Sequence, residues 1–148
     1  MRYLLGVALL LTACMPKYSQ PTTGLLYREG CIRQAEAAKV FVMVVVTAKE
    51  LGMLKRWPVP DKVVACVKST DHLACNGNPK PLKGCTYVNR VWLAGLLPDW
   101  KRVAVHEYIV ALSNTGALSL PGVTAATEAA WTKRKDYRML HDKAIGKL

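Results

Sequence analysis

Features that mark the common enzyme classes are scarce in this sequence of 148 residues. It has no glycine-rich loop of the kind that binds phosphate, and its cysteines form no Cys-x-x-Cys pair. The second absence argues against a zinc ion held by four thiolates, because structural zinc sites of that kind normally use closely spaced cysteines. No internal repeat or low-complexity tract is present, so one small domain is expected.

Acidic residues are also few: there are 10 of them against 21 lysines and arginines, which gives a formal net charge of +11. Such a charge attracts both nucleic acid and anionic membrane surfaces. The basic residues are scattered and no groove-binding motif accompanies them, so nucleic acid is not expected as a partner. For an exported protein, the membrane surface is the better explanation.

The N-terminus lacks a transmembrane helix but carries the marks of export. Residues 4–11 form an apolar stretch, and a membrane-spanning helix would need about 20 such residues. Arg2 precedes this stretch. The positions that end it are Leu11, Thr12, Ala13 and Cys14. A basic start, a short apolar core and small residues at the exit are typical of a secretory signal peptide.

Leu11, Ala13 and Cys14 resemble the lipobox of bacterial membrane lipoproteins, which phages also encode. The resemblance implies a signal peptide over residues 1–13, cleavage before Cys14, and a lipid anchor, palmitate included, on that cysteine. Members of that family carry three acyl chains, and two or more are enough for stable anchoring. Met15 stands where an aspartate would retain the protein in the inner membrane. This implies the outer membrane in a Gram-negative host, at its periplasmic face or the cell surface. The alternative is an ordinary signal peptide that ends near a cysteine.

The mature chain is expected to consist of a lipidated tether over residues 14–24 and a single globular domain over residues 25–148. The domain contains four cysteines: Cys31, Cys66, Cys75 and Cys85. An even number in an exported domain predicts two disulfides, with three possible connectivities. The turn-rich segment 76–84 favours the pair Cys75–Cys85, and hence Cys31–Cys66. Zinc binding by the four thiolates is the competing interpretation.

The pattern of apolar residues and turn signals predicts an α+β fold, a small disulfide-stapled domain with about three helices and a short sheet. The β-branched run at residues 44–46 could instead indicate a strand inside the first helix. Within the second strand, Thr86, Val88, Arg90 and Trp92 are predicted to share one face. The expected elements are a helix at 30–53, strands at 62–68 and 85–94, and helices at 98–112 and 124–145.

One motif with chemical character lies on the second expected helix, where His106 is followed by Glu107. Residues 102–112 resemble the zinc helix of zincin metallopeptidases, whose His-Glu-x-x-His motif places two histidines one turn apart on zinc. A preceding strand and Glu128 on the following helix extend the resemblance to residues 85–131. It implies a zincin-like fold with His106 as the first metal ligand, Glu107 as the catalytic base and Glu128 as the third ligand.

The second histidine of the motif is replaced by Val110, which cannot bind a metal. Two protein ligands do not hold a catalytic zinc tightly, and His72 or His141 would have to supply the missing second ligand. The His-Glu pair can therefore be a chance pair on a helix, the remnant of a lost metal site, or a site with a substituted ligand.

The prediction is a lipid-anchored, non-catalytic envelope lipoprotein without a cofactor. It would act by binding or scaffolding at the membrane, with an envelope protein or a cell-wall polymer as its partner. The alternative is a membrane-tethered, metallopeptidase-like hydrolase that uses zinc.

Overall fold

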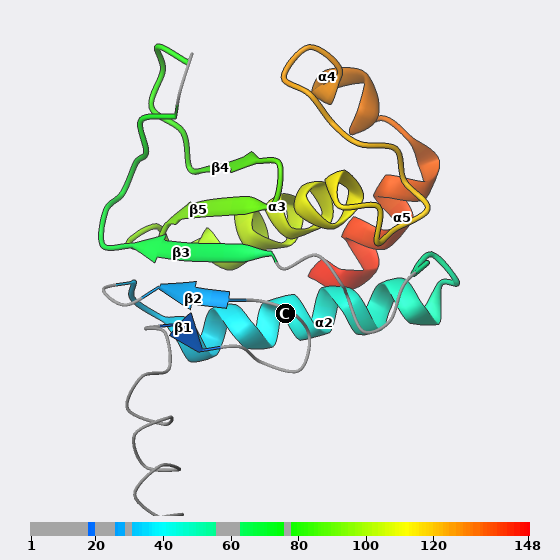
Figure 1. Ribbon diagram of the computed structural model, residues 1–148, viewed down its shortest axis with the longest axis horizontal. Helices are drawn as coiled ribbons and strands as arrows, with labels where there is room; N and C mark the ends of the chain where they lie inside the picture. The colour runs from blue at the N-terminus through cyan, green and yellow to red at the C-terminus, as the bar shows by residue number, and fades with distance from the viewer. Residues whose placement is uncertain (1–17, 20–25, 29–30, 56–62, 76–77) are drawn as a thin grey trace, which may run out of the picture.

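The fold was obtained as a computed structural model, which describes residues 18–19, 26–28, 31–55, 63–75 and 78–148. The signal peptide over 1–13 and the lipidation candidate Cys14 lie outside these residues. The described part forms an α+β domain, as predicted, with helices on one face of a small mixed sheet (Figure 1). None of the helices in these ranges is both long enough and apolar enough to cross a bilayer.

The sheet has the strand order β1-β2-β3-β5-β4. Its strands are β1 (Tyr18–Ser19), β2 (Leu26–Arg28), β3 (Val64–Lys68), β4 (Gly84–Tyr87) and β5 (Arg90–Ala94). The inner pairs β2–β3 and β3–β5 are parallel, and the outer pairs β1–β2 and β5–β4 are antiparallel. Strand β1 falls inside the expected tether of residues 14–24, so the paired part of the chain begins at least as early as Tyr18.

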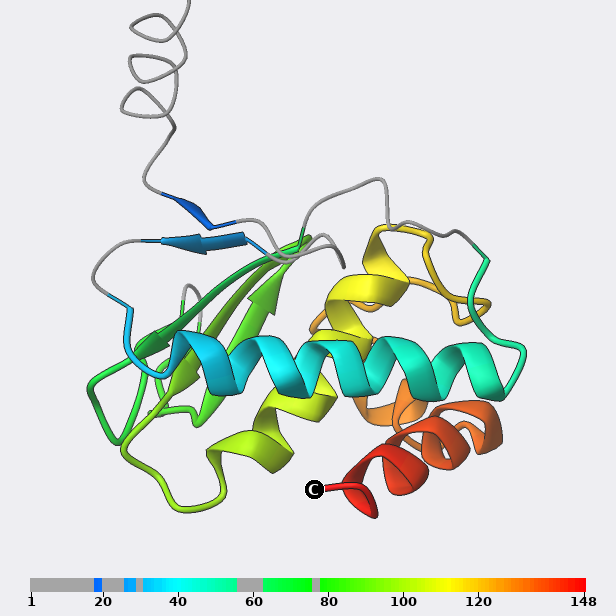
Figure 2. The same ribbon diagram turned by 90° about the horizontal axis from the view of Figure 1, so that it is seen from below.

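The helices are α2 (Gln34–Glu50), α3 (Trp100–Asn114), α4 (Glu128–Trp131) and α5 (Lys135–Ile145). Helix α3 packs on β4 and β5, and α2 packs on β3 and along α3. Helix α5 packs against both α2 and α3 (Figure 2). The short helix α4 lies on the β4 side of the domain, away from α2 (Figure 1).

The core forms where alternate residues of β3 and β5 meet α2 and α3. Val67 and Leu93 are buried on the sheet, and Phe41 and Tyr108 are buried on the helices. The rings of Phe41 and Tyr108 make an edge contact with centroids 5.3 Å apart, and the Tyr108 hydroxyl donates to the backbone oxygen of Ala37 at 3.2 Å. Burying side chains of this size contributes about 1.5–3 kcal/mol each.

The alternative of a strand at residues 44–46 is wrong, because these residues lie within α2. Val44 and Val45 are buried while Val46 is exposed, which is the pattern of a helix with one side on the core. Tertiary packing therefore overrides the strand preference of the β-branched run.

The single strand expected over residues 85–94 is a hairpin. Val88 has a positive φ of 55° and forms, with Asn89, a two-residue turn between β4 and β5. Thr86 then pairs with Val91, whereas Trp92 pairs with Cys85. Directly paired residues share a face, so Thr86 and Trp92 lie on opposite faces, and the prediction of a common face was wrong.

The single helix expected over residues 124–145 is two helices, separated by extended backbone at Arg134. Residues six apart on a continuous helix point about 120° apart. The break lets Trp131 and Tyr137 pack against each other, with ring centroids 4.5 Å apart, while both are buried.

Both predicted disulfide pairings are confirmed. Cys31 is bonded to Cys66, which ties the segment before α2 to β3. Cys75 is bonded to Cys85, which ties the loop after β3 to the edge strand β4. Each bridge is expected to stabilise the domain by about 2–4 kcal/mol.

Candidate functional site

A cleft of about 730 Å³ lies along β4, between the sheet edge and the segment that leads into α4. Its lining residues come from strands β3, β4 and β5, from α3, from the loop before β4 (residues 73–82) and from residues 123–128. The lining residues that matter here are Gly84, Thr86, Trp92, Glu107, Val110 and Glu128. Two of the three predicted zincin-like residues, Glu107 and Glu128, therefore line the cleft. The third, His106, does not line it but contacts the Glu128 side chain.

The backbone of β4 is one wall of the cleft. The amide of Ala94 donates to the backbone oxygen of Lys83 at 2.9 Å, so these two opposite residues form a hydrogen-bonded pair of the ladder between β4 and β5. Because bonded and non-bonded pairs alternate in an antiparallel ladder, the peptide groups of Gly84 and Thr86 point away from β5. Among the described residues no strand lies outside β4, so these groups face the cleft.

Glu107 is the buried acid of the site, with 7% of its surface exposed. The Thr86 hydroxyl donates to its Oε2 at 2.5 Å and also lies 3.3 Å from its backbone oxygen. Burial raises the pKa of this carboxyl; Thr86 and His106 oppose the rise, and Glu128 adds to it. The Glu107 carboxyl therefore keeps its proton to a higher pH than an ordinary surface glutamate does.

Close approach of α3 to β4 depends on Gly84. A Cβ atom at this position would lie 2.7 Å from Cγ1 of Val103 and 3.1 Å from Cγ of Glu107. The missing side chain thus leaves room for the Glu107 carboxyl beside Thr86. Neither Gly84 nor Thr86 was predicted as a site residue, and their spacing of two on a strand is the signal that could have indicated them.

His106 joins α3 to the two C-terminal helices. Its Nε2 lies 2.9 Å from Oε1 of Glu128, and its Nδ1 lies 2.7 Å from the hydroxyl of Tyr137. A carboxylate only accepts, so Nε2 carries a proton and donates to Glu128. In the tautomer with its proton on Nε2, Nδ1 accepts the Tyr137 hydroxyl hydrogen, so both ring nitrogens have protein partners.

Aromatic rings surround this histidine. His106 makes edge contacts with Trp131 and Tyr137, at centroid separations of 6.3 and 5.8 Å. The Trp131 indole donates to the backbone oxygen of Pro121 at 2.9 Å. Burial is the main cause that raises the pKa of Tyr137, with the nearby Glu107 as a second cause, so the phenol keeps its proton and remains a donor. Trp131 and Tyr137 are functional neighbours that the sequence pattern did not indicate.

The predicted metal ligands do not form a fitting zinc site. Val110 lines the same cleft and offers no donor atom. His72 pairs with Asp71 and His141 with Asp142, and neither replacement candidate lines the cleft. In the ranges that the structure describes, no three His, Cys, Asp or Glu residues come together in a way that could hold a metal. The four domain cysteines are bonded in pairs, which removes the thiolate alternative as well.

The zincin-like form of the fold is not supported. His106 and Glu128 do lie together, as that resemblance implies, but as partners of each other, and Glu107 bonds to Thr86. What the arrangement offers is a polar cleft with a protonatable buried acid, a half-exposed carboxylate and a row of outward peptide groups. No protein-family model, curated protein or solved structure matches this chain, so its chemistry has to be derived from these residues alone.

Proposed function

We propose that this chain is a lipid-anchored envelope lipoprotein whose domain binds a partner in the β4 cleft without hydrolysing it. The observation that carries the anchor is the run Leu11, Thr12, Ala13 and Cys14 after a short apolar stretch. Three residues separate Cys14 from Tyr18, the first residue of β1. Four residue steps span at most about 14 Å, so a lipid on Cys14 would keep the β1 edge near the bilayer.

The position of the cleft suits such an anchor. Strands β1 and β4 are the two opposite edges of the sheet. Figure 1 accordingly places β4 and α4 on the side of the domain away from β1 and α2. A membrane at the β1 edge would leave the cleft open toward the envelope space, where a partner can reach it.

The chemistry of the cleft favours binding over hydrolysis. Val110, which has no donor atom, stands where a zinc helix would have its second histidine, and His106 and Glu128 bond to each other. The outward peptide groups of β4 and the Glu128 carboxylate offer both donors and acceptors. An envelope protein segment or a cell-wall polymer presents complementary amide and hydroxyl groups, and these are the partners we propose.

Metabolic labelling tests the anchor. Expressed in a Gram-negative host, the chain should incorporate labelled palmitate and enter the detergent phase, and Cys14→Ser should abolish both. Met15→Ser, one position further, is the matched control and should keep the label. Label that persists in Cys14→Ser would refute the lipoprotein proposal.

A membrane-tethered metallohydrolase is the second candidate, and one observation favours it: the cleft brings Glu107 and Glu128 close to His106. On our proposal, the purified protein carries substoichiometric zinc and has no chelator-sensitive peptidase activity. Stoichiometric zinc that His106→Ala releases would establish the second candidate instead.

A further inference from the structure

Strand β4 is an edge of the sheet, and within the described residues no strand pairs with its outer side. It spans Gly84–Tyr87 and contains neither proline nor a charged residue. Sheet edges are commonly protected by such residues, because the unpaired backbone groups of a bare edge bind further strands. The outer side of β4 is a wall of the cleft described above, so it is open to a further strand.

The backbone groups on this outer side follow the interval of a β-strand. The peptide groups of Gly84 and Thr86 point away from β5, and those of Cys85 and Tyr87 point toward it. Gly84 and Thr86 thus each present an N–H and a C=O to the cleft, about 7 Å apart along the strand. An extended polypeptide repeats its own donors and acceptors at this interval, whereas the hydroxyl groups of a polysaccharide follow the size of its sugar rings. The edge therefore matches a polypeptide better than a cell-wall polysaccharide.

The walls of the cleft are held in place by bonds within the domain. At the end of α3, Nδ2 of Asn114 donates to the backbone oxygen of Val88 at 3.2 Å, and its Oδ1 accepts from the amide of Val123 at 2.7 Å. One side chain thereby joins the β4–β5 turn to the opposite wall. Within β4, the disulfide between Cys75 and Cys85 ties the strand to the preceding loop. A site that is already ordered loses less entropy when a partner binds.

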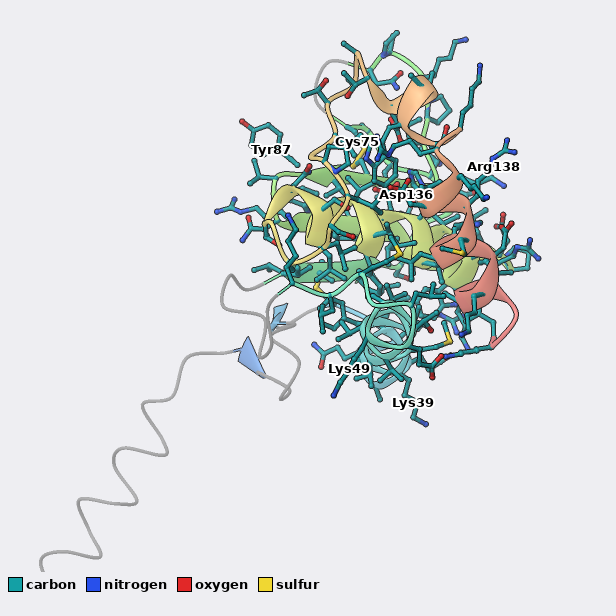
Figure 3. All side chains as sticks on the ribbon, turned by 90° about the vertical axis from the view of Figure 1, so that its right-hand side faces the viewer. Lys39, Lys49, Cys75, Tyr87, Asp136 and Arg138 are labelled. Atoms are coloured by element: carbon teal, nitrogen blue, oxygen red, sulfur yellow. A yellow bond between two sulfur atoms is a disulfide. The ribbon has the colours of Figure 1, made fainter. Side chains whose placement is uncertain are left out.

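The two faces of the sheet would receive alternate side chains of an added strand. Thr86 bonds to Glu107 on the α3 side, so its neighbour Tyr87 points to the opposite face. Tyr87 is 73% exposed, and Figure 3 shows it projecting outward on the side of the domain away from Lys39 and Lys49. Every second side chain of an added strand would therefore lie beside Tyr87, and the others would face α3.

Two cations share the face of Tyr87. Arg90 is paired with Tyr87, and Lys68 is paired with Ala94 at the other end of β5. Both are exposed and line the cleft, and neither is bonded to an acidic side chain of the described residues. A partner segment with Asp or Glu at a position beside Tyr87 would supply the opposite charge.

Resting on the proposed binding in the β4 cleft, we propose that the partner is a protein whose extended segment adds to β4 as a further strand. The segment donates and accepts hydrogen bonds at Gly84 and Thr86, and an acidic side chain on it faces Arg90 or Lys68. Main-chain pairing gives such a complex its affinity, and the alternate side chains give it specificity. Of the two partner classes proposed for the cleft, the protein segment is thus the one that the edge selects.

Residue-resolved hydrogen exchange of the full lipidated chain, followed by NMR, tests this inference. The probes are short peptides, selected from a random phage-displayed library against the chain in detergent micelles and then synthesised. They should be enriched in Asp or Glu. Bound peptide should slow the exchange of the Gly84 and Thr86 amides by about tenfold or more, because both N–H groups gain an acceptor. The Cys85 and Tyr87 amides point toward β5 and are the internal control.

Matched pairs make the test specific for backbone pairing. N-methylation of every second peptide amide removes the donors along one edge of the bound strand only. Methyl groups in the phase that faces β4 should weaken binding about tenfold more than methyl groups in the other phase. On the protein, Thr86→Pro and Thr86→Ala both lose the hydroxyl, but only Thr86→Pro loses the outward N–H. Thr86→Pro should therefore bind peptide about fivefold more weakly than Thr86→Ala.

Three results would overturn strand addition. No peptide is selected, or bound peptide shifts the resonances of Glu107 and Val110 without slowing exchange at Gly84 and Thr86, or methylation in either phase has the same effect. Soluble peptidoglycan fragments separate these failures from that of the proposed function. If peptides or fragments shift the resonances of the cleft, binding there stands and only strand addition fails. If neither does, the proposed function fails as well.

Discussion

Nε2 of His106 lies 2.9 Å from Oε1 of Glu128, across 22 positions of the sequence. This contact and the hydrogen bond from Tyr137 to the other ring nitrogen fasten α4 and α5 to α3. A histidine held on both sides in this way positions the walls of the cleft. The same two residues that would bind a metal in the zincin pattern here bind each other.

The two contacts of His106 should differ in their contribution to stability. His106→Ala leaves the buried Tyr137 hydroxyl without its hydrogen-bond partner, and an unsatisfied buried group costs about 1–3 kcal/mol. Glu128→Ala removes a contact at the surface and should cost less. Chemical denaturation measures both. His72→Ala is the control, because that ring is exposed and pairs with the neighbouring, exposed Asp71 in the loop after β3. A loss as large in the control would contradict the role given to His106.

Glu107 should make the domain less stable as the pH rises. Its folded-state pKa lies above the ordinary value of 4.5 because of burial, so the folded protein binds the proton more tightly than the unfolded chain. The stabilisation is complete below pH 4.5 and decreases as the pH rises through the folded-state pKa. Glu107→Gln cannot ionise, so its melting temperature relative to that of the wild type should rise as the pH increases over this range. Glu128→Gln, at an exposed carboxyl, is the matched comparison. A constant difference between Glu107→Gln and the wild type at every pH would be evidence against the raised pKa.

Placing an imidazole at position 110 should create a zinc site. Val110 lies one helical turn after His106 and lines the cleft with Glu128. Two histidines four residues apart on a helix, with a nearby carboxylate, form a ligand set that zinc accepts. Zinc should raise the melting temperature of Val110→His, in proportion to the logarithm of its concentration above the dissociation constant, and leave the wild type unchanged. The double variant with His106→Ala should lose the effect. If zinc stabilises the wild type equally, Val110 is not what excludes the metal.

Gly84 is predicted to be required for the packing of α3 on β4. The Cβ atom of Gly84→Ala would approach Val103 to 2.7 Å, and forcing such overpacking costs about 1–3 kcal/mol. Gly146→Ala is the matched control, because its Cβ atom would meet only backbone oxygens at 3.5 Å, an ordinary contact. Denaturation midpoints compare the two. Equal stabilities would mean that the approach of α3 to β4 is looser than these distances indicate.

Local patterns were enough to predict the α+β class, the positions of α2, β3 and α3, and both disulfide pairs. They missed the break at Arg134, because the burial of Trp131 and Tyr137 decides it and burial is a tertiary property. They also missed the turn at Val88, since a positive φ at a valine is not indicated by local propensity.

The candidate site was predicted in part. The zincin resemblance identified Glu107, His106 and Glu128, and the fold brings the last two into contact. Their partners Thr86 and Tyr137 come from a strand and from a later helix, and only the packing of those elements on α3 brings them near. Without that packing, neither the bond of Glu107 nor the engagement of both His106 nitrogens could be inferred.

The mass of the mature N-terminus tests the central claim most directly. The chain is purified from the membranes of a Gram-negative host, digested, and its N-terminal peptide is analysed by mass spectrometry. On our account, this peptide begins at Cys14 and carries a diacylglyceryl group on the thiol, with a further acyl chain on the amine. An N-terminus at any other residue, or a Cys14 peptide with an unmodified thiol, would contradict the account.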